Sequence, residues 1–262
     1  MAAERILIVD DDPLNLKLTG SLLVREGFEV QVANDGQQAL AVVASFRPHL
    51  MLSDIQLPRI DGLELARRLR SGTDSRNLVI IALTAYGMKG DEERAMEAGC
   101  DDYITKPIDP RRLSGILRRH LDEMNHASSQ APAPVPSNPT TGLGSDHGVI
   151  DIADFKMRVG GDQGLMNDLI HLLLADAPEL AAATRKAALE KDNQALKDAA
   201  HKLKGSVATF SAPRAYQAAC VLEEMGAGGD LSQAIGAVET LQGELTLLFS
   251  ELAKIAKETT PA

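Results

Sequence analysis

The chain has 262 residues, a length that at about 150 residues per domain indicates two domains. Its 44% apolar and 24% charged residues are typical of globular proteins and exclude collagen-like and wholly disordered chains. Acidic residues outnumber basic ones by 37 to 27, and both halves of the chain are acidic, so we predict no nucleic-acid binding. We find no apolar run of ~18 residues and no secretory signal, and we therefore expect a cytoplasmic protein without membrane insertion.

Short apolar runs alternate with amphipathic segments in the first half of the chain. The runs are rich in β-branched and aliphatic residues and predict strands over 5–9, 28–32, 49–53, 78–84 and 102–105. The segments between them predict helices over 13–25, 36–46, 61–70, 90–98 and 109–124. This alternation predicts an α/β domain over residues 1–124, with a parallel sheet covered by helices on both faces.

Residues 125–148 are rich in Pro, Ser, Thr and Gly, and they predict an extended linker because they have too few large apolar residues to form a core. Residues 149–262 show only helical spacing, over 152–158, 163–190, 192–209, 212–226 and 230–258. We expect Pro178 to break or kink the second of these helices. The pattern predicts an all-α domain, a bundle of about four long antiparallel helices.

Polar side chains gather at four strand ends of the predicted sheet, namely Asp10, Asp11, Asp12, Asp54, Thr84 and Lys106. The carboxyl ends of parallel strands lie at one edge of a sheet, where ligands bind. Carboxylates placed close together repel each other unless a cation neutralises them, and Mg²⁺ fits that need. With a hydroxyl and an ammonium group beside it, Asp54 suits a nucleophile toward a phosphoryl group. Taken one at a time, these residues equally fit helix caps and strand ends.

The strings ILIVDDDP, LMLSDIQLPRIDG, IALTA and DYITKP resemble, in order and spacing, the signatures of bacterial response-regulator receiver domains over residues 4–124. That family has a flavodoxin-like, doubly wound, five-stranded parallel sheet, in agreement with the pattern above. The resemblance implies that Asp54 accepts the phosphoryl group. It also implies that Mg²⁺ is held by Asp10, Asp11, Asp54 and the backbone carbonyl of Gln56.

The same resemblance gives roles to residues on the later strands. It implies that Thr84 and Lys106 contact the phosphoryl oxygens, and that Thr84 and Tyr103 form the switch that reports phosphorylation. A half-buried tyrosine on an edge strand explains Tyr103 equally well. Tyr86 occupies a variable position of the family, and we hypothesise that its ring shields the phosphoryl group from water.

The segment DAAHKLKGSVATF places one histidine apart from the apolar face of its helix. Leu203 and Val207 belong to the apolar stripe, whereas His201 lies on the opposite side. Lys204 is nearby, and Gly205 leaves bare surface one turn on. An open imidazole beside an ammonium group suits nucleophilic attack on a phosphoryl group. Residue types alone also fit a solvated histidine on a lysine-rich face.

The string HKLKGSVA resembles the HxLKGxxA signature of histidine-phosphotransfer (Hpt) domains, and the resemblance extends over residues 150–258. It implies that His201 accepts the phosphoryl group, that Lys204 steadies the phosphate and that Gly205 leaves a gap for the partner. Thr209 and Ser211 stand where the family often has Asn and Gly, which bears on the choice of partner.

Together these features predict a two-component phosphorelay protein that passes a phosphoryl group between Asp54 and His201. No kinase domain or ATP-binding motif is recognisable, so we predict no ATP-dependent kinase activity. The predicted partners are an upstream histidine kinase or hybrid kinase and, if the Hpt domain passes phosphate onward, a downstream receiver domain. The alternative is a phosphorylation-regulated interaction module whose helical domain binds a partner without carrying phosphate.

Overall fold

The N-terminal domain is built on a five-stranded parallel sheet in the computed structural model, which describes residues 3–72, 77–85, 90–125 and 148–259. The strand order is β2-β1-β3-β4-β5, and all four pairings are parallel. Each predicted strand is confirmed to within one residue. The strands are β1 (Arg5–Val9), β2 (Glu29–Ala33), β3 (Leu50–Asp54), β4 (Val79–Ala85) and β5 (Asp102–Lys106).

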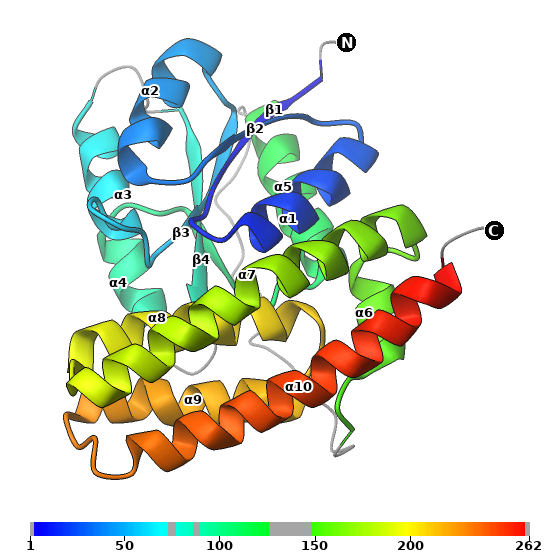
Figure 1. The fold of residues 1–262 in the computed structure, drawn as a ribbon. Coiled ribbons are helices and arrows are strands. Elements are labelled where there is room, and N and C mark those ends of the chain that lie inside the picture. Colours follow the sequence, from blue (N-terminus) through cyan, green and yellow to red (C-terminus); the bar gives the residue numbers. More distant parts are fainter. Residues whose placement is uncertain (1–2, 73–76, 86–89, 126–147, 260–262) are drawn as a thin grey trace.

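Helices cover both faces of this sheet because successive strand residues point to opposite sides. Leu7 and Val9 of β1 pack with apolar residues of α2 (Gly36–Phe46), α3 (Gly62–Ser71) and α4 (Asp91–Glu97). Ile6 and Ile8 pack on the other face with apolar residues of α1 (Pro13–Arg25) and α5 (Pro110–Asn125). Figure 1 shows these two helical layers on either side of the strands. The predicted doubly wound α/β fold is confirmed.

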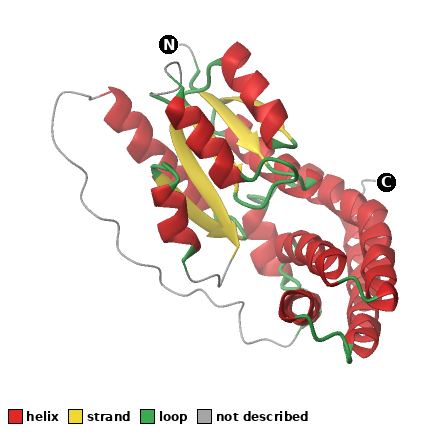
Figure 2. Ribbon diagram, turned by 90° about the vertical axis from the view of Figure 1, so that its left-hand side faces the viewer, coloured by secondary structure: helices red, strands yellow, loops and turns green. Residues whose placement is uncertain are grey.

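The C-terminal domain is all helical, as predicted. Four long helices form a bundle (Figure 2). The short α6 joins it through a contact between the rings of Phe155 and Phe210, whose centroids lie 4.9 Å apart. Pro178 does not interrupt its helix, which continues through it. The helices are α6 (Ile152–Arg158), α7 (Gln163–Glu190), α8 (Asn193–Thr209), α9 (Pro213–Gly228) and α10 (Ala234–Thr259).

Helices α8 and α9 lie close together at a glycine. A Cβ atom on Gly226 would lie 2.7 Å from the backbone nitrogen of Lys197, so no larger residue fits there without moving the helices apart. The predicted linker lies outside the described residues except for its two end residues, of which Asn125 ends α5. No helix among the described residues is long and apolar enough to cross a bilayer.

Helix α1 buries apolar side chains on two sides and thereby joins the two domains. Leu16 and Leu23 face the sheet, whereas Leu14, Leu18 and Leu22, spaced four residues apart, belong to the apolar core of the bundle. The first and the last of these three are 1% and 3% exposed. Figure 1 shows α1 alongside α7. The sequence predicted α1 only as a helix of the sheet domain, and its contact with the bundle was not predicted.

Candidate functional site

Three carboxylates converge at the carboxyl edge of the sheet. Asp10, Asp11 and Asp54 each place one oxygen within 4.8 Å of the others. The ammonium group of Lys106 donates to Asp10 and to Asp54, in both cases over 2.6 Å. This edge therefore holds three carboxyl groups against the one ammonium group that its own domain supplies through Lys106.

Burial makes this excess of negative charge costly. Removal from water raises the pKa of Asp10 to about 7, and the neighbouring Asp54 carboxylate adds to the rise. Burial opposes the charge on Lys106, but the carboxylates of Asp10 and Asp54 outweigh that effect and raise the pKa of its ammonium group. Lys106 thus stays charged, and the cluster still has too few cations. A hard divalent cation with oxygen ligands fits this donor set.

The backbone around Asp54 depends on a close approach by α3. A Cβ atom on Gly62 would lie 2.0 Å from the carbonyl oxygen of Asp54, so only glycine fits at the start of this helix. The backbone N–H of Gln56 donates to the Asp54 carboxylate over 3.1 Å. The role of the Gln56 carbonyl as a metal ligand stays a prediction.

The predicted phosphoryl contacts and the predicted switch lie on β4 and β5. Thr84 is buried at the end of β4 and pairs in register with Thr105, next to Lys106. Tyr103 is half-buried on β5, and burial and a hydrogen bond to Glu92 raise the pKa of its hydroxyl. Tyr86 lies outside the described residues.

His201 lies on α8 and is held by a carboxylate from α9. Its Nδ1 atom is 2.6 Å from Oε1 of Glu223, whose other oxygen accepts a hydrogen bond from Lys204. Burial favours the neutral acid, but the hydrogen bonds from His201 and Lys204 outweigh it and lower the pKa of Glu223. Glu223 is therefore a carboxylate that can accept a hydrogen bond from the Nδ1 atom of His201. In the neutral ring, a proton on Nδ1 leaves the lone pair on Nε2.

One expectation about His201 needs correction. The His201 side chain is only 20% exposed, rather than open to solvent, because it lies in a pocket lined by both domains. Lys204 is 8% exposed and its charge is balanced by Glu223. The role of Lys204 in steadying a phosphate stays a prediction. In this structure its ammonium group donates a hydrogen bond to Glu223.

Sequence reasoning missed Glu223, although a signal was present. Ala219 and Leu222 lie on the buried face of α9, and Glu223, four residues after the first and adjacent to the second, is itself only 7% exposed. A carboxylate on the apolar side of a helix requires a buried cationic or hydrogen-bonding partner. The sequence did not identify this partner, because the partner depends on how α9 packs against α8.

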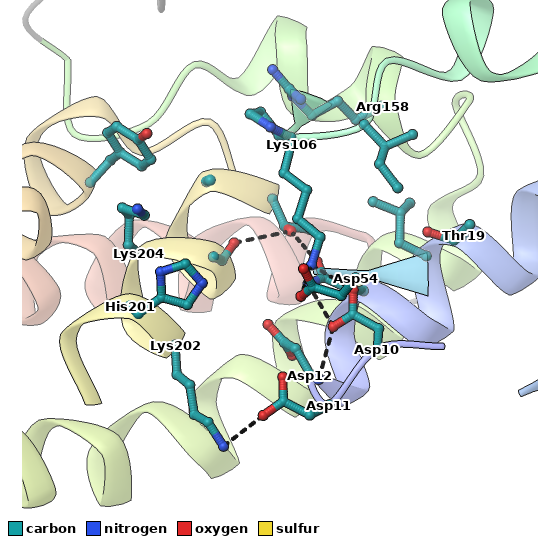
Figure 3. A pocket seen from close by; sticks show the side chains of 18 residues that line it. Asp10, Asp11, Asp12, Thr19, Asp54, Lys106, Arg158, His201, Lys202 and Lys204 are labelled. Atoms are coloured by element: carbon teal, nitrogen blue, oxygen red, sulfur yellow. Dashed lines mark hydrogen bonds and ion pairs between the residues drawn. The ribbon is translucent and has the colours of Figure 1, made fainter. Parts of the chain in front are cut away.

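The strand-end cluster and the histidine line one pocket from opposite domains (Figure 3). Lys202, next to His201, forms an ion pair with Asp11 over 2.8 Å. A Cβ atom on Gly205 would lie 3.8 Å from a carboxylate oxygen of Asp12, so this bare surface of α8 faces the sheet domain. Figure 3 shows His201 on the side of Lys204 and Lys202, across from Asp54 and Lys106.

Asp12 is separate from the three-carboxylate group. One of its oxygens accepts a hydrogen bond from the backbone N–H of Leu14 and so caps α1. The other accepts from the hydroxyl of Ser206 on α8 over 3.1 Å. For Asp12 the helix-capping interpretation is therefore right, and the residue contributes to the contact between domains.

Comparison with known families assigns both halves of the chain. Residues 6–118 match the response regulator receiver domain, and residues 168–253 match the Hpt domain. The chain carries a receiver domain followed by an Hpt domain. Its domains are therefore those of two-component phosphorelay signalling.

Two curated bacterial proteins illustrate the similarity. The signal transduction histidine-protein kinase BarA of Shigella flexneri is 28% identical over 256 residues, which is 98% of this chain but only 27% of BarA. The polar-differentiation response regulator DivK of Brucella anthropi is 40% identical over 118 residues, which is 45% of this chain and 96% of DivK. The chain thus spans about a quarter of the length of BarA, and its receiver half aligns with nearly the full length of DivK.

Among solved structures, the receiver domain of a Pseudomonas aeruginosa sensor histidine kinase, with magnesium coordinated in its active-site cleft, is 36% identical. It covers 46% of this chain and 99% of its own, with a TM-score of 0.44. The similarity covers the receiver domain alone.

The two departures from the Hpt pattern have different surroundings. Ser211 has a positive φ of 53°, and its hydroxyl bridges Asp154 and Arg158, which fixes α6 to the end of α8. The hydroxyl of Thr209 lies 3.4 Å from the side-chain oxygen of Asn15 on α1. Thr209 therefore faces the receiver domain, and Ser211 anchors the N-terminal helix of the Hpt domain.

Proposed function

We propose that this chain carries a phosphoryl group on Asp54 and on His201 and passes it between them within one molecule. The observation that carries the proposal is the shared pocket, in which both side chains lie from opposite domains. The ion pair between Lys202 and Asp11 and the hydrogen bond between Ser206 and Asp12 support it, because both close the domains over this pocket.

In the proposed transfer, the lone pair on Nε2 of His201 attacks the phosphorus atom of phosphorylated Asp54. The new N–P bond forms as the P–O bond to Asp54 breaks, and the Asp54 carboxylate is the leaving group. The proton on Nδ1 stays in place. The ring gains positive charge, which the Glu223 carboxylate stabilises from 2.6 Å. The reverse reaction uses the same groups, with the Asp54 carboxylate as nucleophile.

Asp10, Asp11 and Asp54, with the backbone carbonyl of Gln56, are the proposed ligands of Mg²⁺. When bound, the ion would supply positive charge to the phosphoryl oxygens. The raised pKa of Asp10 supports this assignment, as does the receiver domain's supply of only one ammonium group, that of Lys106, to the three-carboxylate group. In the proposed site Lys106 contacts a phosphoryl oxygen, since its ammonium group already donates to Asp54.

Other parts of the proposal concern the state of the receiver and its partners. Thr84 and Tyr103 are the proposed switch residues at the phosphorylated edge. An upstream histidine kinase or hybrid kinase is the proposed phosphoryl source, since no ATP-dependent kinase activity is assigned to these two domains. A cytoplasmic location is part of the proposal because such a kinase works where ATP is present. A downstream receiver domain would take phosphate from His201.

The test is to determine where the label lies after incubation of the full chain with a labelled acyl phosphate and Mg²⁺. Wild type is compared with Asp54→Ala and His201→Ala, and acid-labile, alkali-stable label is scored as phosphohistidine. The proposal expects phosphohistidine that requires both residues. Label confined to Asp54 in wild type would refute the transfer and favour an interaction module instead.

A further inference from the structure

The contact between the domains has an apolar centre that does not by itself select one receiver. Leu14, Leu18 and Leu22 of α1 enter the core of the Hpt bundle. Apolar burial contributes most of the attraction but is non-directional, so any receiver with leucines at these positions would fit. Selection of one receiver must come from polar groups around this centre.

One such group is an ion pair at the middle of α1. The ammonium group of Lys17 lies 2.8 Å from a carboxylate oxygen of Asp168 on α7. The two side chains are 43% and 56% exposed, so the pair adds little stability. The positive charge of Lys17 still affects the choice of receiver, because a receiver with an acidic residue at the position of Lys17 would place a second negative charge beside Asp168.

A second group lies at the end of α1. The guanidinium group of Arg25 donates to the carbonyl oxygens of Val159 and Gly160, just beyond the last turn of α6. The carbonyl oxygen of Val159 also accepts a hydrogen bond from the backbone N–H of Asp162 over 3.2 Å. A Cβ atom on Gly160, whose φ is 62°, would lie 2.0 Å from the Arg25 guanidinium group. A side chain at this position would therefore displace Arg25.

Neither contact belongs to the phosphoryl-transfer pocket. The residues of α1 that line the pocket are Asn15, Leu18 and Thr19, and neither Lys17 nor Arg25 is among its lining residues. Changes at Lys17 or Arg25 therefore alter how the domains dock and leave the reacting groups in place.

We propose that Lys17 and Arg25 are specificity-determining residues that, with Asp168 and Gly160, commit this Hpt domain to the receiver of its own chain. The inference rests on the proposed function, since it concerns the partner of the same transfer. A foreign receiver must displace α1 and offer a matching cation at both positions. Transfer within the chain is therefore favoured over transfer between chains.

The test uses two full-length chains, so that label must pass between molecules. The donor carries His201→Ala and is labelled on Asp54, and the acceptor carries Asp54→Ala. Adding Asp168→Lys to the donor and Lys17→Glu to the acceptor breaks the ion pair inside each chain. The pair between the donor's Lys17 and the acceptor's Asp168 stays intact. We expect transfer between chains to become about three- to tenfold faster.

Two controls isolate the ion pair. Glu190→Lys in the donor and Arg67→Glu in the acceptor change the net charges equally on exposed surface outside the contact, and should leave the rate unchanged. Both interface reversals placed together in each chain restore opposite charges everywhere and should return the baseline rate. An unchanged or slower rate with the split reversals would overturn the inference, and so would phosphohistidine that forms in wild type but in none of the mixtures. Absence of phosphohistidine from wild type as well would instead refute the proposed function.

The second contact is tested separately. Arg25→Ala in the acceptor weakens only the acceptor's internal contact, because the donor's Arg25 still meets the acceptor's Gly160. Transfer between chains should rise about two- to fivefold. Arg25→Ala in the donor weakens both the donor's internal contact and the contact between chains, and should give no rise. Equal effects of Arg25→Ala in the donor and in the acceptor would contradict a role for Arg25 in selecting the receiver.

Discussion

The two proposed phosphoryl carriers have opposite surroundings. Asp54 lies among carboxylates and shares one ammonium group with Asp10. His201 lies beside a single carboxylate, Glu223, which also holds Lys204. The first cluster carries an excess of negative charge, whereas the second is balanced without any added ion.

This difference indicates how much added positive charge each site needs. The receiver edge is stable only when it gains protons or cations, and in the docked chain it gains Lys202 from the Hpt domain. The histidine site needs no added charge, so it can hold its geometry on its own.

The largest effect is expected at Glu223. Glu223→Ala leaves the 8%-exposed ammonium group of Lys204 without its carboxylate, which should lower the free energy of unfolding by about 3–5 kcal/mol. Glu223→Gln keeps the shape and a hydrogen-bond acceptor and should cost less. Urea unfolding of both variants at neutral pH measures the difference.

The pH dependence of this contribution has a definite sign. Because the pKa of Glu223 is lowered on folding, its stabilisation is present above the ordinary value of 4.5 and is lost as the pH falls through the lowered value. The difference between wild type and Glu223→Gln should therefore shrink in acid. A difference that grew in acid would show that Glu223 is protonated in the folded protein.

The receiver edge should behave in the opposite way. The pKa of Asp10 rises from 3.8 to about 7 on folding, so its penalty is absent below about pH 4, builds as the pH rises and is complete above about pH 7. In metal-free buffer at pH 8, Asp10→Asn should raise the free energy of unfolding by about 2–4 kcal/mol. At pH 4 the two proteins should be nearly equal. Equal stability at both pH values would contradict the charge excess.

Most of the fold could be predicted from the sequence because each element carries a local signal. The apolar run LVIIALT gives a buried strand, and Gly27 and Gly99 end helices with positive φ angles of 97° and 95°. The strand-end residues were also accessible, because parallel topology alone brings Asp10 and Asp54 to one edge.

The partners of the histidine and the contact between domains could not be predicted in this way. Glu223 meets His201 only through the packing of α9 on α8, 22 residues along the chain. The leucines of α1 are also typical of a helix that packs only against a sheet, so the sequence did not reveal that some of them contact the bundle. The sequence placed Asp12 both in the acidic cluster and at a helix cap, and only the three-dimensional arrangement showed the cap.

The smallest effect is expected at Lys202, whose ammonium group forms an ion pair with Asp11. Lys202→Ala removes a half-exposed ammonium group 2.8 Å from one proposed metal ligand. Because a nearby positive charge opposes cation binding, the variant should bind Mg²⁺ about two- to fivefold more tightly, as measured by calorimetry. Lys186→Ala, at an exposed ion pair on α7, is the matched control. Weaker binding by Lys202→Ala would mean that the lysine orients Asp11 for the metal.

The central claim is that Asp54 and His201 exchange a phosphoryl group within one chain, and its most direct test is a dilution series. Full-length protein is labelled rapidly by an acyl phosphate, the donor is removed, and the appearance of phosphohistidine is followed over a hundredfold range of protein concentration. A rate constant that does not depend on concentration is the predicted result. A rate that rises in proportion to concentration, or no phosphohistidine at any concentration, would contradict the account.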